Sequence, residues 1–182
     1  MLLFGILFTM NGSTHSADDD NTGPIPMGAG RLVTDAVMGG VSFGEVRREH
    51  RAGRDCVCLS GDVRTDNDGG FIQLAVDLDE GLARAAGDFD GVRLEVLGNG
   101  QIYNVHLRTR DLWLPWQSYR APFTAAPGWR TVELAFGQFE PYRTTTPLRV
   151  DRLKRVGIVA IGRDFAADVC VAGLSLYRNA DR

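Results

Sequence analysis

The feature that most constrains the fold of this chain is a series of short apolar segments separated by turn-forming residues. Segments 71–78 and 129–136 place an apolar side chain at every second position, as does a β-strand with one buried face. Only residues 80–89 suit one or two helical turns. Many short strands with almost no helix predict an all-β protein, a β-sandwich or jelly roll of two antiparallel sheets.

The alternation also predicts which side chains face the core. Segment 91–109 is typical of a β-hairpin that turns at 98–100, and the nearly continuous apolar run 155–162 indicates a central strand. Segments 56–65 and 169–177 add two further strands. The expected inward side chains are Ile72, Leu74, Val76, Leu78, Val92, Leu94, Val96, Tyr103, Val105, Leu107, Val132, Leu134 and Phe136.

The chain of 182 residues divides into a leader with a linker, residues 1–30, and one folded domain, residues 31–178. The leader opens with an apolar run that resembles a weak secretory signal with a cut after Ala17. A misassigned start codon or a disordered leader fits equally well. The run is too short to span a bilayer, so no transmembrane segment is expected. A bacterial cytoplasmic protein and an exported one both stay open.

The charge and the cysteines exclude several classes of protein. A net charge of -3 argues against a nucleic-acid partner recognised through a broad basic surface. Cys56, Cys58 and Cys170 form neither a disulfide framework nor a zinc motif. Three buried thiols are the favoured interpretation, although Cys170 could bridge to one of the other two if their strands are neighbours.

No constellation of catalytic residues emerges, so the chain is predicted not to be an enzyme and to need no cofactor or metal. The acidic segment 66–70, with Asp66, Asn67 and Asp68, could supply calcium ligands, but a tight turn is favoured because a downstream glutamate is missing. An enzyme acting on a small ligand stays as a third interpretation. Its ionisable candidates are Asp35, Asp66, Asp68, Arg93, His106 and Arg108.

Aromatic residues concentrate in segment 111–123 and at Trp129, with arginines on either side. On an exposed loop of a β-sandwich, such side chains can stack on sugar rings or contact a partner protein. They can equally fill the core. The residues concerned are Trp113, Trp116, Tyr119, Phe123 and Trp129, with Arg108, Arg110 and Arg120.

Segment 35–44, with the sequence DAVMGGVSFG, has too many glycines for a helix or a regular strand. Asp35 and Ser42 can accept hydrogen bonds from loop amides. We therefore expect a structural hairpin or bulge in which Val37, Val41 and Phe43 pack inward.

Together with four later motifs, this segment resembles the complex I intermediate-associated protein 30 family. The opening motif is matched at Asp35, Val37, Met38, Gly39, Gly40, Ser42 and Gly44, and a Gly-Gly-Phe motif at Gly69, Gly70 and Phe71. The remaining matches are Gly98, Gly100, Tyr103, Leu107, Arg108, Tyr119, Phe123, Trp129, Val132, Phe136, Phe139 and Pro141.

The resemblance implies a jelly-roll sandwich like galactose-binding domains. It also implies a non-catalytic assembly chaperone, since mitochondrial members assist assembly of respiratory NADH:ubiquinone oxidoreductase. The chain lacks an amphipathic transit peptide, so a bacterial or stand-alone member is expected. Its partners would be proteins such as respiratory-complex subunits, or a carbohydrate if the fold serves as a sugar-binding module. The expected binding residues are Asp35, Met38, Gly39, Gly40, Ser42, Gly69, Gly70, Tyr103, Arg108, Trp113, Trp116 and Tyr119.

Overall fold

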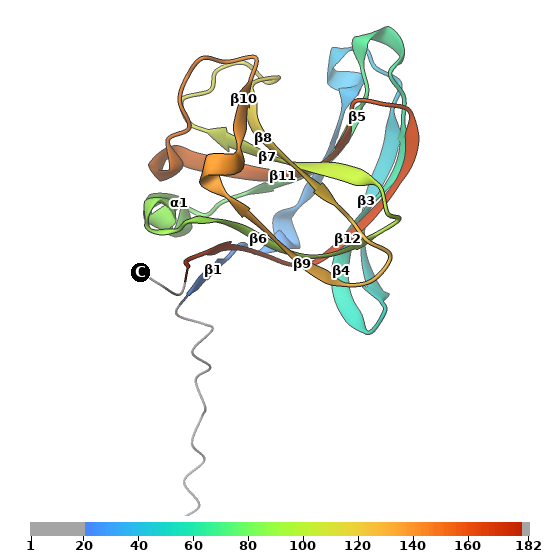
Figure 1. Ribbon diagram of the computed structural model, residues 1–182. Helices are drawn as coiled ribbons and strands as arrows, with labels where there is room; N and C mark the ends of the chain where they lie inside the picture. Colours follow the sequence, from blue (N-terminus) through green and yellow to red (C-terminus); the bar gives the residue numbers. More distant parts are fainter. Residues whose placement is uncertain (1–20, 180–182) are drawn as a thin grey trace, which may run out of the picture.

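Two antiparallel sheets of six strands each pack face to face in the computed structural model, which describes residues 21–179 (Figure 1). In spatial order, sheet A contains β3 (Phe43–Arg51), β4 (Arg54–Val63), β12 (Phe165–Tyr177), β6 (Gly91–Gly98) and β9 (Arg130–Ala135), and β1 (Thr22–Pro24) also pairs with β12. Sheet B contains β10 (Glu140–Tyr142), β8 (Ser118–Thr124), β7 (Ile102–Thr109), β11 (Leu153–Ile161), β5 (Phe71–Asp77) and β2 (Arg31–Thr34). The predicted all-β sandwich of two antiparallel sheets is confirmed.

The helical segments are short and lie between strands. Helix α1 (Glu80–Ala85) falls where one or two helical turns were predicted, and Asp79 begins it by accepting a hydrogen bond from the Leu82 amide at 2.9 Å. No helix in the described part of the chain is long and apolar enough to cross a membrane. The single-turn 3-10 helices are η1 (Met27–Ala29), η2 (Asp35–Met38), η3 (Asp66–Asp68), η4 (Ala86–Asp88), η5 (Phe136–Gln138) and η6 (Val150–Arg152).

The core between the sheets consists of the side chains that the alternation placed inward. Of the predicted set, Ile72, Leu94 and Tyr103 are fully buried, and Leu78, Val132 and Phe136 are partly buried against the core. Burying one such apolar side chain contributes about 1.5–3 kcal/mol, so the many alternating positions together hold the sheets in contact. The side chain of Val37 lies outside the described residues.

The sandwich begins before the predicted boundary at Arg31. Residues 22–24, expected as linker, form β1, which pairs with residues 175–177 of β12, and Ile25 is buried. The 66–70 segment forms the tight turn that was favoured there: the Gly69 amide donates to the Asp66 carbonyl at 3.1 Å, and Asn67 has a φ of 57°. The predicted leader, residues 1–20, and the Asp68 side chain lie outside the described residues.

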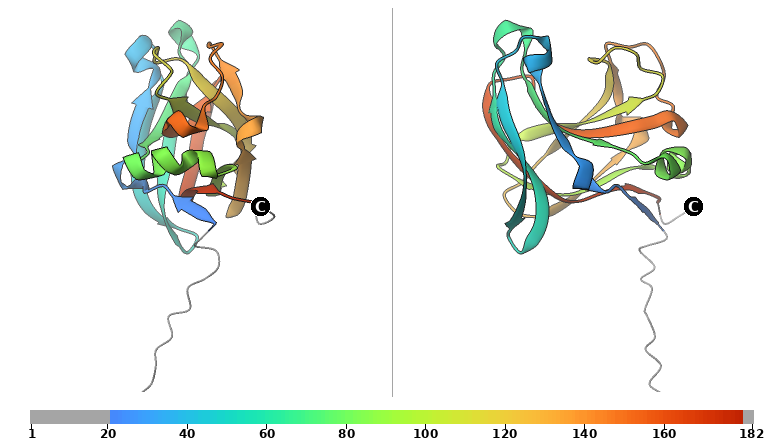
Figure 2. Two further views of the ribbon diagram at one scale, coloured as in Figure 1. Left: turned by 90° about the vertical axis from the view of Figure 1, so that its left-hand side faces the viewer. Right: turned by 180° about the vertical axis from the view of Figure 1, so that it is seen from behind.

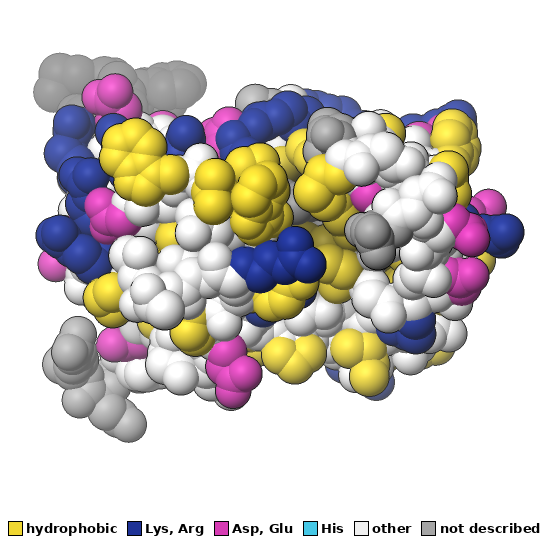
Figure 3. All heavy atoms as spheres, turned by 90° about the horizontal axis from the view of Figure 1, so that it is seen from above, with side chains coloured by type: hydrophobic (Ala, Val, Ile, Leu, Met, Phe, Trp, Pro, Cys, Tyr) yellow, Lys and Arg dark blue, Asp and Glu magenta, His cyan; other side chains and the backbone are white. Residues whose placement is uncertain are grey.

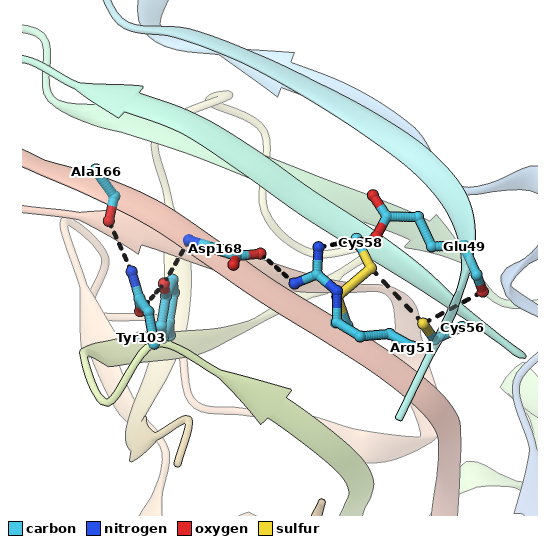
Figure 4. A network of polar contacts seen from close by, with 9 residues as sticks. Glu49, Arg51, Cys56, Cys58, Tyr103, Ala166 and Asp168 are labelled. Atoms are coloured by element: carbon cyan, nitrogen blue, oxygen red, sulfur yellow. Dashed lines mark hydrogen bonds and ion pairs between the residues drawn. A yellow bond between two sulfur atoms is a disulfide. The ribbon is translucent and has the colours of Figure 1, made fainter. Parts of the chain in front are cut away.

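A disulfide crosslinks sheet A between Cys58 on β4 and Cys170 on β12, which are directly paired residues 112 positions apart (Figure 4). The favoured interpretation of three thiols is therefore wrong, because the strands concerned are neighbours. Cys56 remains a free thiol with its Sγ 3.6 Å from the Cys58 Sγ. Burial raises the pKa of the Cys56 thiol, and Trp129 packs against the cluster.

Sheet B lies above sheet A in Figure 1, and its outer face is turned away from the core. Loops rise on both sides of this face. The segments containing η2 and η3 lie on one side, and the β7–β8 and β10–η6 loops lie on the other, in every view (Figures 1 and 2). We call the outer side chains of sheet B together with these flanking loops the sheet B face.

Candidate functional site

The glycine-rich segment 35–44 is organised by the buried carboxylate of Asp35. This carboxylate accepts hydrogen bonds from the Ser42 hydroxyl at 2.5 Å, the Ser42 amide at 3.1 Å, the Gly70 amide at 2.6 Å and the Phe71 amide at 3.3 Å. Burial by itself would raise the pKa of Asp35, but these hydrogen bonds outweigh it and hold the pKa below its ordinary value. The predicted site residues Asp35, Ser42 and Gly70 thus bond to one another inside the protein.

Two predicted glycines are explained by the space around this carboxylate. A Cβ atom on Gly40 would lie 2.2 Å from Asp35 Cγ, and one on Gly69 would lie 2.5 Å from Asp35 Oδ2. Gly39 ends η2 with a φ of 88°, which favours glycine. The motif therefore shapes a loop in which polar groups, rather than apolar ones, turn inward.

The prediction that Val41 and Phe43 pack inward is wrong, since their side chains are 51% and 70% exposed. Ser42 lies between them and points inward to Asp35, so its two neighbours point outward. Val41 and the exposed Met38 form an apolar edge on the η2 side of the sheet B face, whereas Phe43 begins β3 of sheet A.

The predicted residues Tyr103 and Tyr119 are buried, and their hydroxyl groups bind the protein itself. Tyr103 donates to Asn99 Oδ1 at 2.8 Å and accepts from the Asp168 amide at 2.9 Å (Figure 4). The Tyr119 hydroxyl lies 3.0 Å from the carbonyl oxygens of Thr146 and Pro147. Tyr119 therefore anchors the β10–η6 loop, whereas Tyr103 links β7 to the β6–β7 turn and to β12 of sheet A.

Arg108 holds the β7–β8 loop, which carries the predicted Trp113 and Trp116. Its Nη1 donates to the carbonyl oxygens of Leu114, Pro115 and Gln117 at 3.0, 2.6 and 2.9 Å. Because one planar guanidinium binds several carbonyls at once, the loop has a defined path. Trp113 is 90% exposed and Trp116 is 40% exposed.

Six of the seven large apolar side chains that are exposed in residues 21–179 belong to sheet B or its flanking loops, and the seventh, Phe43, is on β3 of sheet A. Figure 3 looks onto the sheet B face and shows apolar side chains gathered around it, with lysine or arginine side chains between them. Ile102, on β7, is the one residue of this set that lies on a strand of sheet B. The full set is Met38, Val41, Phe43, Ile102, Trp113, Leu114 and Trp116.

The strands between these apolar edges present a polar floor. His106 on β7 pairs with Arg120 on β8 and with Gly157 on β11. The Gln73 side chain lies over Gly157, because a Cβ there would be 2.4 Å from Gln73 Nε2. Within the described part of the chain, the side chains of Gln73, Asn104 and His106 make no hydrogen bond. The side chains of Gln73 and Asn104 are partly exposed, whereas His106 is buried beneath them.

An open pocket of 370 Å³ adjoins this floor where β5 and β7 end. Its cations are Arg108, Arg110 and Lys154, and its single carboxylate, Asp77, is bound by Arg155 and Arg31. These two arginines hold the pKa of Asp77 at about 2. This end of the sheet B face is consequently basic.

In residues 21–179, one group of potential metal ligands converges: the sulfur atoms of Cys56, Cys58 and Cys170, within 4.8 Å of one another. Two of these atoms form the disulfide, so the cluster does not offer three thiolates in this structure. It lies in sheet A, away from the floor.

Sequence reasoning missed Arg120, Gln73 and Asn104 as members of one surface. Arg120 was noted only as a neighbour of the aromatic residues. The signal that could have found them is the same alternation that identified the core, since the polar residues at the intervening positions share the outer face. The cross-strand partners could not be read from one sequence.

The model of the complex I intermediate-associated protein 30 family matches residues 24–169. A comparison with curated proteins finds no match. Among solved structures, the family 11 carbohydrate-binding module of Clostridium thermocellum, in complex with a mixed-linked tetrasaccharide, is similar with a TM-score of 0.70 at 10% identity, covering 89% of this chain and 98% of that one.

Two further structures support the same fold. The family 30 carbohydrate-binding module of a Clostridium thermocellum cellulosomal cellulase gives a TM-score of 0.58 at 9% identity, with 88% of this chain and 96% of that one covered. An agarase gives a TM-score of 0.53 at 8% identity, with 87% of this chain but 25% of the enzyme covered. At these identities the likeness establishes the jelly-roll sandwich, as predicted, and the fold alone.

Proposed function

The chain belongs to the complex I intermediate-associated protein 30 family, and from this premise we propose that it is a non-catalytic binding module that captures a polypeptide at the sheet B face. In the role that fits the family, the partner is a subunit of NADH:ubiquinone oxidoreductase and the protein acts as its assembly factor. The proposal includes no chemical step.

The observation that carries this proposal is the grouping of exposed apolar side chains on one face. Trp113 at 90% exposure and Val41 at 51% are unfavourable in water unless a partner covers them. Tryptophan and arginine are also the residues that most often dominate the binding energy of protein interfaces. Apolar edges around a polar floor match the composition of a surface that binds another protein.

A polypeptide fits this face better than a sugar because of where the open aromatic rings lie. Tyr142 is the aromatic residue on the outer side of β10, and the Arg120 guanidinium carbon lies 3.3 Å from its ring centroid. That ring face is occupied. The exposed tryptophans both lie on one loop, so no row of open rings crosses the floor for successive sugar units to stack on.

Carbohydrate binding is the second candidate, favoured by one observation. The partly exposed floor side chains Gln73 and Asn104 make no hydrogen bond in the described part of the chain, and two exposed tryptophans lie on a loop that flanks the same face. Sugar hydroxyls need such groups beside an aromatic surface. The solved modules with this fold are described as carbohydrate-binding, which makes the candidate worth a direct test.

The test is affinity purification of the tagged full chain from its own host, followed by mass spectrometry, with a glycan array run on the same protein. The variants are Trp113→Ala with Trp116→Ala, and Arg47→Ala on β3 of sheet A as the matched surface control. We expect subunits of NADH:ubiquinone oxidoreductase to co-purify with the unmodified chain and the control but not with the tryptophan variant. A glycan hit without such subunits would overturn the assembly proposal in favour of the second candidate.

A further inference from the structure

Arg120 carries a positive charge that no acidic side chain offsets. It is half-buried on the outer side of β8, and its Nε donates to the Ser118 hydroxyl at 3.2 Å. Among residues 21–179, no carboxylate lies within ion-pair distance of it. Even Glu140, its direct partner on β10, is an exposed residue that makes no ion pair with it. A half-buried charge without an opposite charge is costly.

The cross-strand neighbour of Arg120 does not reduce this imbalance. His106 is its cross-strand partner on β7, and the buried Nε2 atom of His106 has no hydrogen-bond partner. Burial lowers the pKa of His106 to about 3, with a further contribution from the Arg120 charge, so this imidazole is neutral at pH 7. It neither compensates the guanidinium nor provides a competing charge.

The next cations along the floor are partly compensated. Arg108 is bound by neutral carbonyl oxygens only, whereas its cross-strand partner Arg155 is paired with Asp77. Arg110 and Lys154 extend the positive charge into the adjoining pocket. The floor therefore runs from an unpaired arginine to a basic pocket, between the apolar edges described above.

From this charge distribution we propose that the partner polypeptide contributes an acidic segment, with one carboxylate bound by the guanidinium of Arg120. The inference rests on the proposed function, since it names the chemistry of the segment that the sheet B face would hold. A guanidinium presents a planar set of donors that fits a carboxylate with two hydrogen bonds. The ring of Tyr142 beneath Arg120 fixes the plane in which those donors lie. The apolar edges would hold the flanking apolar residues of the same segment.

The test uses an oligoglutamate peptide as the probe and an uncharged Gly-Ser peptide of equal length as its comparison, titrated into the full chain. The variants are Arg120→Gln and Arg130→Gln. Arg130 is exposed on β9 of the other sheet, so this control removes an equal charge from a distant surface. Arg120→Lys is a third variant that keeps the charge but not the planar donor set, in case Arg120→Gln does not fold.

We expect oligoglutamate to bind the unmodified chain, with a shift of the His106 ring signals in NMR spectra, and Gly-Ser to leave them unchanged. Arg120→Gln should weaken the affinity about tenfold or more, because a hydrogen-bonded charge pair is lost, and Arg130→Gln should not. Arg120→Lys should be intermediate. Equal weakening in the Arg120 and Arg130 variants, or full binding by Arg120→Gln, would overturn the inference.

The purification experiment separates this inference from the proposed function. If the tryptophan variant loses its partner while Arg120→Gln keeps it, the result supports the sheet B face as the binding surface and contradicts the carboxylate contact with Arg120. If both variants keep the partner, the proposal that the sheet B face binds it is wrong. If both lose it and Arg130→Gln does not, both proposals are supported.

Discussion

Asp35 and Ser42 form a buried pair in which the hydroxyl donates to the carboxylate at 2.5 Å, and this pair joins three segments of the chain. The Ser42 hydroxyl also accepts from the Arg64 amide at 3.0 Å, and the carboxylate accepts from the amide of Gly70. The loop before β3, the end of β4 and the start of β5 are thus held by one polar cluster. The most recognisable motif of the sequence is structural in this respect.

Replacing Asp35 by Asn should lower the free energy of unfolding by about 2–4 kcal/mol. One acceptor oxygen becomes an amide group that faces backbone N–H donors, which leaves buried donors without partners. Urea denaturation would measure the loss. Asp66→Asn, on exposed η3, should change stability by no more than about 0.5 kcal/mol, and an equal loss in both would show that the buried cluster has no special role.

Replacing Gly40 by Ala should destabilise the protein by about 1–3 kcal/mol, the usual range for overpacking. Its Cβ would lie 2.2 Å from Asp35 Cγ, so the carboxylate must move and its hydrogen bonds lengthen. Gly128 has no atom within 4 Å of an added Cβ and serves as the control. Thermal unfolding should show a lower midpoint for Gly40→Ala and nearly the same midpoint for Gly128→Ala.

His106 should make the protein less stable as the pH falls from about 6.5 towards 3. Its pKa is about 3 in the folded chain and about 6.5 when unfolded, so only the unfolded state binds a proton in this window. The loss should approach 1.4 kcal/mol per pH unit, or about 2 kcal/mol between pH 7 and 5.

The variant His106→Gln should abolish most of this pH dependence. Asp35 and Asp77, whose pKa values are lowered in the folded chain, lose their contributions only at more acidic pH and do not obscure the comparison. Denaturant unfolding at pH 7 and at pH 5 would measure it. If the free energy of unfolding of the variant fell between pH 7 and pH 5 as much as that of the unmodified chain, His106 would be protonated in the native protein.

Breaking the Cys58–Cys170 disulfide by Cys170→Ala should cost about 2–5 kcal/mol of stability. Cys56→Ala leaves the crosslink intact and should cost less. Thiol titration of the unfolded, unreduced chain should find one reactive thiol, and three after reduction. Three thiols before reduction would contradict the crosslink.

Replacing Arg108 by Lys should loosen the tryptophan loop without unfolding the sandwich. The lysine side chain ends one bond short of Nη1 and has no second nitrogen to bind the Leu112 carbonyl, so the bonds to Leu114, Pro115 and Gln117 should be lost or lengthened and limited proteolysis within 110–117 should become faster. Arg110→Lys, at an exposed position, should be cleaved like the unmodified chain. Equal rates for all three proteins would mean that Arg108 does not order the loop.

The strands and core could be predicted because a buried sheet face repeats every second residue, as at Ile72 and Leu74. The same rule failed at Val41 and Phe43, because Ser42 and not its apolar neighbours turns inward to the Asp35 carboxylate. The hydrophobicity of the segment does not predict this orientation, because its cause is a hydrogen bond from Ser42 to the Asp35 carboxylate, several residues earlier in the chain.

The floor could not be predicted because it depends on pairing across strands. His106, Arg120 and Gly157 come from β7, β8 and β11, and nothing in their sequence positions gives the register that aligns them. The disulfide was left open for the same reason. Cys58 and Cys170 can bond only because β12 returns beside β4.

Gly157 leaves room on β11 for the Gln73 amide, whose Nε2 would lie 2.4 Å from a Cβ at this position. A side chain as small as alanine at this position would lift that amide, and a larger one would raise a ridge along the middle of the floor. The shape of the face therefore depends on a position that contributes no side chain, so a change there would alter the face while the strand pairing of the sandwich stays the same. Partner choice and fold stability would then be under separate control.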